Sequence, residues 1–98
     1  MSQDLFRRVN RAALANHKNI LDQLLPDGRQ IGKEFVARNP RRNDQRQGSF
    51  KVNLNTGRWA DFAVGVSGGD PVSLVAYVAG LSQIEAAREL ARALGVQQ

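Results

Sequence analysis

The chain has 98 residues and a mass of 10.8 kDa, with 42% hydrophobic residues, 23% charged residues and a formal net charge of +5. This length and composition predict one small domain with a modest core and exclude a chain that is disordered throughout. The absence of cysteine, with a single histidine at His17, excludes disulfides, thiolate zinc sites and cysteine nucleophiles. No apolar run approaches the about 20 residues of a membrane span, and the N-terminus does not resemble a signal peptide, so we expect a cytoplasmic protein.

The positive charge is concentrated in the middle of the chain. Residues 29–58 contain eight basic and two acidic residues, a local net charge of +6, and the total of +5 leaves −1 for all the others. A basic segment between nearly neutral ends predicts contact with a polyanion such as nucleic acid. The alternative is a solvated loop that happens to be rich in arginine.

The N-terminal residues 3–25 are predicted to be helical, because apolar residues recur at steps of three and four. The polar residues 16–18 interrupt this pattern, which allows two helices with a break between them. Residues 26–28, Pro-Asp-Gly, end the helical region. His17 lies in the polar break, and we expect it to be a surface residue.

The central residues 31–64 change to a period of two. Apolar and polar residues alternate over 50–55, the Asn-Thr-Gly sequence at 55–57 is typical of a hairpin turn, and residues 58–64 form the return strand. Residues 33–38 are predicted to form a third, weaker strand.

The C-terminal residues 70–95 are predicted to form two helices. Asp-Pro at 70–71 is typical of an N-cap followed by proline at the first helical position, and Ser82 and Glu85 form a capping box that opens the second helix. The glycine-rich residues 65–69 lack the Lys-Ser/Thr end of a phosphate loop, which favours a tight turn before a capped helix.

These patterns together predict a single α+β domain over residues 1–98. It consists of a helical N-terminal segment (1–26), a three-stranded antiparallel sheet (31–64) and a pair of helices (70–95). No paired-carboxylate motif or nucleophile–base arrangement is recognisable, so we expect no catalytic residues, no metal site, no cofactor and no enzymatic activity.

The hairpin and the loop before it hold the residues that we expect to bind nucleic acid. Basic groups would contact the backbone, asparagines would contact bases or sugars, and an aromatic face would stack on an unpaired base. A hairpin loop of two or four residues turns Trp59 inward beside Leu54, whereas a loop of three residues turns Trp59 outward and Phe62 inward. The candidate nucleic-acid-binding residues are Arg38, Arg41, Arg42, Arg46, Lys51, Asn53, Asn55, Arg58 and Trp59.

Several short motifs occur in a fixed order over residues 25–95. They are Asn-Pro at 39–40, Gly-Ser-Phe-Lys-Val at 48–52, Gly-Arg-Trp-Ala-Asp-Phe-Ala at 57–63, Gly-Gly-Asp at 68–70 and Gly-Leu-Ser at 80–82. In this order and spacing they resemble the N-terminal zinc-finger-like module of Toprim-type DNA primases. The resemblance is closer to a variant of that module in phage and plasmid primase–helicase proteins.

The resemblance implies a zinc-ribbon-like scaffold that engages single-stranded template DNA, rather than duplex, during replication of a phage or plasmid. It implies no catalysis, since the primase active site lies in another domain. That family binds zinc through a Cys-x-x-His pair before the first strand and a Cys-x-x-Cys pair after the second. Here Asn39, Arg42 and, approximately, Asp61 and Val64 stand at those positions, so we expect a metal-free variant.

A lost zinc site must be replaced by other interactions, because structural zinc contributes about 10 kcal/mol or more. The helical residues 3–25, together with Trp59 or Phe62 in the vacated centre, are the predicted replacement. Besides DNA, the expected partners are a primase, a helicase or a host protein, and no membrane. The alternative function is a small phage or mobile-element regulatory or inhibitor protein that docks on another protein; the basic charge disfavours mimicry of DNA.

Overall fold

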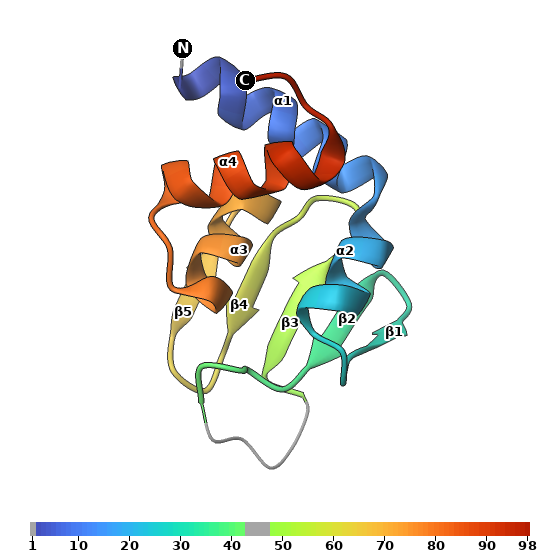
Figure 1. Ribbon diagram of the computed structural model, residues 1–98. Helices are drawn as coiled ribbons and strands as arrows, with labels where there is room; N and C mark the ends of the chain where they lie inside the picture. The colour runs from blue at the N-terminus through green and yellow to red at the C-terminus, as the bar shows by residue number, and fades with distance from the viewer. Residues whose placement is uncertain (1, 43–47) are drawn as a thin grey trace.

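The computed structural model describes residues 2–42 and 48–98 (Figure 1). In chain order its elements are α1 (Ser2–Ala15), α2 (His17–Leu24), β1 (Arg29–Ile31), β2 (Glu34–Ala37), β3 (Phe50–Asn53), β4 (Trp59–Asp61), β5 (Val66–Gly68), α3 (Pro71–Ala79) and α4 (Gln83–Leu94). The α+β class is therefore as predicted. No helix among the described residues is both long and apolar enough to cross a membrane.

The sheet is a five-stranded antiparallel meander in the order β1-β2-β3-β4-β5, so the prediction of three strands was wrong. The central strands lie within the predicted segments, but β1 and β5 extend the sheet at both edges. All residues of β1 are exposed and show no alternation of buried and exposed positions. The short β5 lies inside the glycine-rich segment that was interpreted as a turn. Neither edge strand therefore carries a recognisable hydrophobic pattern.

The register of the β3–β4 hairpin decides which aromatic side chain enters the core. Val52 pairs with Trp59, and the Asn53 N–H donates to the Arg58 carbonyl at 2.7 Å, which closes a four-residue loop. Side chains alternate between the faces of a sheet, so Trp59 lies on the buried face with Val52. Phe62 is 72% exposed. Of the two orientations considered for Trp59, the structure shows the inward one.

The helices cover one face of this sheet and form two adjoining cores. Leu21 and Leu25, from α2 and the residue after it, pack with Leu74 of α3 against Phe35 and the other inward side chains of the sheet. A second core lies between α1, α3 and α4. Figure 1 shows α1 and α4 together at one end of the molecule, with the sheet extending away from them.

The C-terminal helices begin and end as predicted. Asp70 caps α3 by accepting the Ser73 N–H at 2.8 Å, and Ser82 and Glu85 form the capping box of α4. Glycines in the left-handed conformation follow both helices.

The break between the first two helices is at Asn16, also as predicted, but the expectation for His17 was wrong. His17 is buried, with 5% exposure, and its Nδ1 forms a hydrogen bond of 2.9 Å with the Leu54 carbonyl. It therefore joins the start of α2 to the β3–β4 loop. A buried histidine between polar neighbours adds nothing to the hydrophobic pattern of the sequence, so that pattern did not predict its burial.

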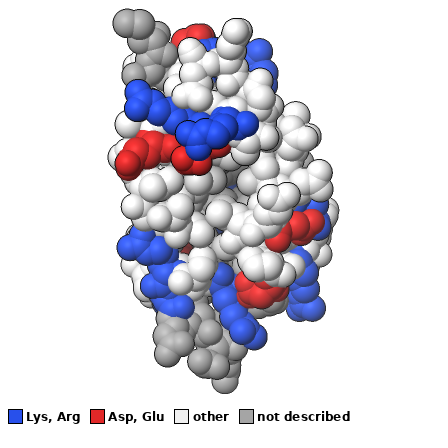
Figure 2. All heavy atoms as spheres, in the orientation of Figure 1, with Lys and Arg blue, Asp and Glu red and all other residues white. Residues whose placement is uncertain are grey.

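Charged groups of both signs lie side by side on the face shown in Figure 2. On the helices several of them are paired within one helical turn, including Asp4 with Arg8 and Lys18 with Asp22. These exposed pairs neutralise one another locally, so most of the helical surface is not uniformly basic.

Candidate nucleic-acid interface

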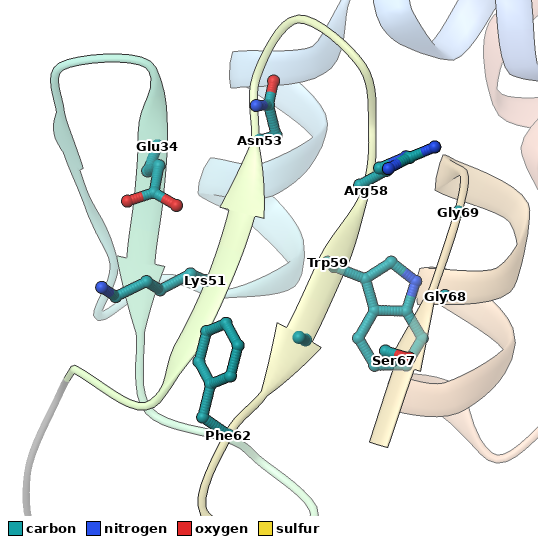
Figure 3. Close-up of a pocket in the computed structure, with 10 residues that line it drawn as sticks. Glu34, Lys51, Asn53, Arg58, Trp59, Phe62, Ser67, Gly68 and Gly69 are labelled. Atoms are coloured by element: carbon teal, nitrogen blue, oxygen red, sulfur yellow. The ribbon is translucent and has the colours of Figure 1, made fainter. Parts of the chain in front are cut away.

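The opposite face of the sheet carries no helix among the described residues and holds a shallow depression of about 550 Å³ (Figure 3). Strands β2, β3, β4 and β5 all contribute to it. Its lining residues are Glu34, Lys51, Asn53, Arg58, Trp59, Ala60, Phe62, Ser67, Gly68 and Gly69. Four of the predicted binding residues, Lys51, Asn53, Arg58 and Trp59, are thus brought to one place.

Two cations of the depression have no acidic partner among the described residues. Lys51 and Arg58 form no ion pair within the part of the chain that the structure describes. Arg29 of β1 lies on the same face, because it pairs with Val36, which in turn pairs with Lys51. The face therefore presents positive charge from β1 to β4 that is available to an anionic ligand.

Phe62 is the largest exposed apolar side chain of this face. Its backbone N–H donates to the Ser49 carbonyl at 3.0 Å, which continues the β3–β4 pairing by one more residue and fixes the position of its Cα. Figure 3 shows the phenyl ring standing on the open side of the sheet. An exposed aromatic ring beside cations offers a face on which a planar group of a ligand can stack. From the sequence, we considered Phe62 and Trp59 as alternatives for the inward position. The sequence did not show which of the two rings is exposed, because that depends on the length of the hairpin loop.

Trp59, by contrast, is only 5% exposed. Its ring packs against Tyr77 and Phe50, with centroid distances of 5.1 and 6.0 Å, and its Nε1 donates to Ser73 Oγ at 2.9 Å. Only an edge of Trp59 reaches the depression. The interpretation of Trp59 as a stacking platform was therefore wrong, because its faces and its donor are already occupied by the core.

The two predicted asparagines, Asn53 and Asn55, differ in the hydrogen-bonding groups that they can present to a ligand. Asn53 Oδ1 accepts the N–H groups of Asn55 and Thr56 at 2.9 and 3.0 Å, so its carbonyl oxygen is used to close the hairpin loop. Its Nδ2 remains as a donor toward the depression. Asn55 is exposed in the turn and does not line the depression.

The predicted arginines that the structure describes in this loop, Arg38, Arg41 and Arg42, do not line the depression. Arg41 donates from Nη1 to the Tyr77 carbonyl at 2.9 Å, and its guanidinium lies over the Tyr77 ring. Arg42 forms an ion pair with Asp61. Arg38 is exposed, with its Nε 3.9 Å from Asp27 Oδ2. Arg46 lies outside the described residues.

A buried polar cluster lies on the other side of β4, around the carboxylate of Asp61, which is fully buried. Asn39 donates from Nδ2 to Asp61 Oδ2 at 2.8 Å, and Arg42 Nη1 lies 3.1 Å from the same oxygen. The Ala63 N–H donates to Asp61 Oδ1 at 2.9 Å. Burial of Asp61 acts to raise its pKa, but the hydrogen bonds from Asn39, Ala63, Arg42 and Ser49 outweigh burial and lower the pKa below its usual value.

This cluster contains three of the four positions that correspond to zinc ligands in the resemblance to primases. Asn39 and Arg42 precede β3 and Asp61 ends β4, whereas Val64 is exposed. The set does not fit a zinc ion, because a guanidinium is a cation with no lone pair to donate. Arg42 instead supplies the positive charge that faces Asp61. No group of three or more His, Cys, Asp or Glu side chains that could hold a metal ion occurs within the described residues.

Comparison of the chain with protein-family models, with curated proteins and with solved structures gave no match.

Proposed function

We propose that this chain is an accessory module that binds single-stranded DNA on the uncovered face of its sheet, in the replication of a phage or plasmid. The observation that carries the proposal is the position of Phe62. Its exposed ring borders a depression that also contains Lys51 and Arg58, neither of which has an acidic partner among the described residues. Aromatic faces that stack on bases, next to cations that follow the phosphates, form the recurring surface of single-strand binding proteins.

The shape of the face favours a single strand over a duplex. The depression is shallow and lies within the sheet, and none of the described helices or strands protrudes from it in a way that could enter a major groove. In a duplex both faces of each base are covered by its neighbours, so the Phe62 ring has no free base on which to stack. An unpaired base offers such a face, and its stacking contributes about 1–3 kcal/mol.

The replication context rests on the resemblance to primase modules, and the buried cluster supports it. Residues at three metal-ligand positions of that family, Asn39, Arg42 and Asp61, converge here although Asp61 lies 22 positions after Asn39 and 19 after Arg42. We propose that this hydrogen-bonded cluster has replaced the zinc ion while keeping the scaffold. The role is one of binding and not of catalysis.

Titration of a fluorescent oligodeoxythymidylate of about 12 nucleotides tests the proposal. We expect the single strand to bind and the matched duplex to bind more weakly. The Phe62→Ala variant should lose roughly 5–150-fold in affinity, which corresponds to the loss of one stacked base. Val64→Ala is the matched control, because Val64 is also an exposed apolar residue of the same turn but does not line the depression.

The competing function, docking on another protein, makes a different prediction for the same variants. A protein interface centred on the exposed apolar residues would depend on Val64 as well as on Phe62, and the oligonucleotide would not bind. Absence of binding at low salt, or equal affinities of wild type and Phe62→Ala, would contradict the proposal.

A further inference from the structure

We propose that Glu34 makes the depression selective for guanine, so that the face holds one guanine base of the single strand. This inference rests on the proposed function and deepens it. Glu34 is an acidic side chain among cations, and a surface that bound phosphates alone would not need it.

Glu34 is the only acidic residue among the described residues that line the depression. It opens β2, pairs with Asn53 across the ladder and is half-buried. No described residue forms an ion pair or a hydrogen bond with its carboxylate. A free carboxylate repels phosphates, so its presence on a cationic face calls for a ligand group that donates hydrogen bonds.

The groups around Glu34 are donors. Lys51 and Arg58 carry only N–H groups, and Asn53 has only its Nδ2 left, because its Oδ1 closes the hairpin loop. The depression therefore presents one strong acceptor, the Glu34 carboxylate, next to several donors. Figure 3 shows the Glu34, Lys51 and Asn53 side chains on the same open side of the sheet as Phe62.

This arrangement matches one DNA base better than the other three. Guanine carries two adjacent N–H donors, at N1 and the 2-amino group, beside a carbonyl acceptor at O6. A carboxylate accepts from both donors, while an ammonium or amide group donates to the carbonyl. Cytosine and adenine present a ring nitrogen acceptor next to their amino group, and thymine presents a single N–H between two carbonyls, so none of them pairs with both carboxylate oxygens.

The depression is large enough to receive a base. Its volume of about 550 Å³ lies in the range of sites for small ligands. Figure 3 shows Phe62 at the other end of the depression from Glu34, so Phe62 stacks on a neighbouring base while Glu34 meets the edge of the guanine. A specific base contact and a non-specific stacking contact are thus combined in one site.

The test compares oligodeoxythymidylates that carry one central deoxyguanosine, deoxyinosine, deoxyadenosine or deoxycytidine. We expect the guanine oligonucleotide to bind about tenfold more tightly than the thymine, adenine and cytosine ones, which is the discrimination of one bidentate contact. Inosine lacks the 2-amino group and should lose most of this preference.

The matched variants are Glu34→Gln at the site and Glu89→Gln on the exposed surface of α4. Glu34→Gln should abolish the preference for guanine and leave binding of the all-thymine strand unchanged or tighter, because a repulsive charge is removed. Glu89→Gln should preserve the preference. Thermal unfolding checks that both variants keep the wild-type fold.

Equal binding of all the oligonucleotides by the wild type, or a preference for guanine that survives Glu34→Gln, would overturn the inference and leave the proposed function standing. Failure to bind any single strand would overturn both.

Discussion

Asn39 and Asp61 lie 22 positions apart in the chain and are joined inside the core by a hydrogen bond of 2.8 Å. The same Asn39 Nδ2 also lies 2.8 Å from Tyr77 Oη, and Arg42 completes the partners of the Asp61 carboxylate. This cluster ties the segment before β3 to the end of β4 and to α3. Phe62 follows Asp61 directly, so the cluster helps to fix the backbone from which the exposed ring projects.

The Asp61→Asn variant should be destabilised by about 2–4 kcal/mol, because it leaves the Arg42 charge and buried donors without their acceptor. Urea unfolding followed by Trp59 fluorescence measures the change. Asp22→Asn is the control, since the exposed Lys18–Asp22 pair contributes under about 0.5 kcal/mol. Equal destabilisation of the two variants would mean that the buried cluster contributes no more to the free energy of unfolding than an exposed ion pair does.

The contribution of Asp61 should depend on pH in a defined direction. Its pKa in the folded protein is lowered, whereas in the unfolded chain it is about 3.9. The folded state therefore binds fewer protons, and the stabilisation is complete above pH about 4 and lost as the pH falls through the lowered pKa. The difference in free energy of unfolding between wild type and Asp61→Asn should shrink over that acidic range. A difference that stays constant down to pH about 2 would contradict this assignment.

Two neighbouring glycines should respond differently to alanine. A Cβ at Gly68 would lie 2.4 Å from Trp59 Nε1 and 2.5 Å from Ser73 Oγ, so Gly68→Ala should disrupt this hydrogen bond and destabilise the domain by about 1–3 kcal/mol. A Cβ at Gly69 meets nothing within 4 Å. Gly69→Ala should therefore unfold at nearly the wild-type temperature. Calorimetry of the two variants measures both effects, and equal melting temperatures would refute the packing of Trp59 described above.

The dependence of binding on salt should report the cations of the sheet face. If Arg29, Lys51 and Arg58 each contact one phosphate, the slope of log K against log salt is roughly −2 for a single strand. The Lys51→Gln/Arg58→Gln double variant should reduce the slope to roughly −0.7. Arg88→Gln, on exposed helical surface, should leave it unchanged. A slope that is insensitive to the double variant would remove these residues from the interface.

The sequence predicted those parts of the fold that are formed by interactions between residues close together in the chain. The caps of α3 and α4, the break at Asn16 and the central strands all have residue patterns that act within a few positions. The edge strands β1 and β5 were missed because they form by pairing with β2 and β4, and their own composition does not indicate strands. The three-residue β5 contains a glycine that is needed for the approach of Trp59.

The candidate site was only partly predictable for the same reason. The basic and aromatic residues of the hairpin were identified, but which ring is exposed depends on the loop length. Asn53 fixes that length through its side-chain bonds to the loop backbone, which no alternation of residues reveals. Arg41 and Arg42 belong to the charged segment in the sequence, yet tertiary contacts with Tyr77 and Asp61 engage them elsewhere.

We propose that the uncovered face of the sheet binds a single strand of DNA. Chemical-shift mapping of the amide resonances during titration with an oligodeoxythymidylate tests it most directly. We expect the largest changes at Lys51, Ala60, Phe62 and Ser67, which share the open side of the sheet, and small changes on α1 and α4. Changes concentrated on the helices, or around Arg41 beside Tyr77, would contradict the account.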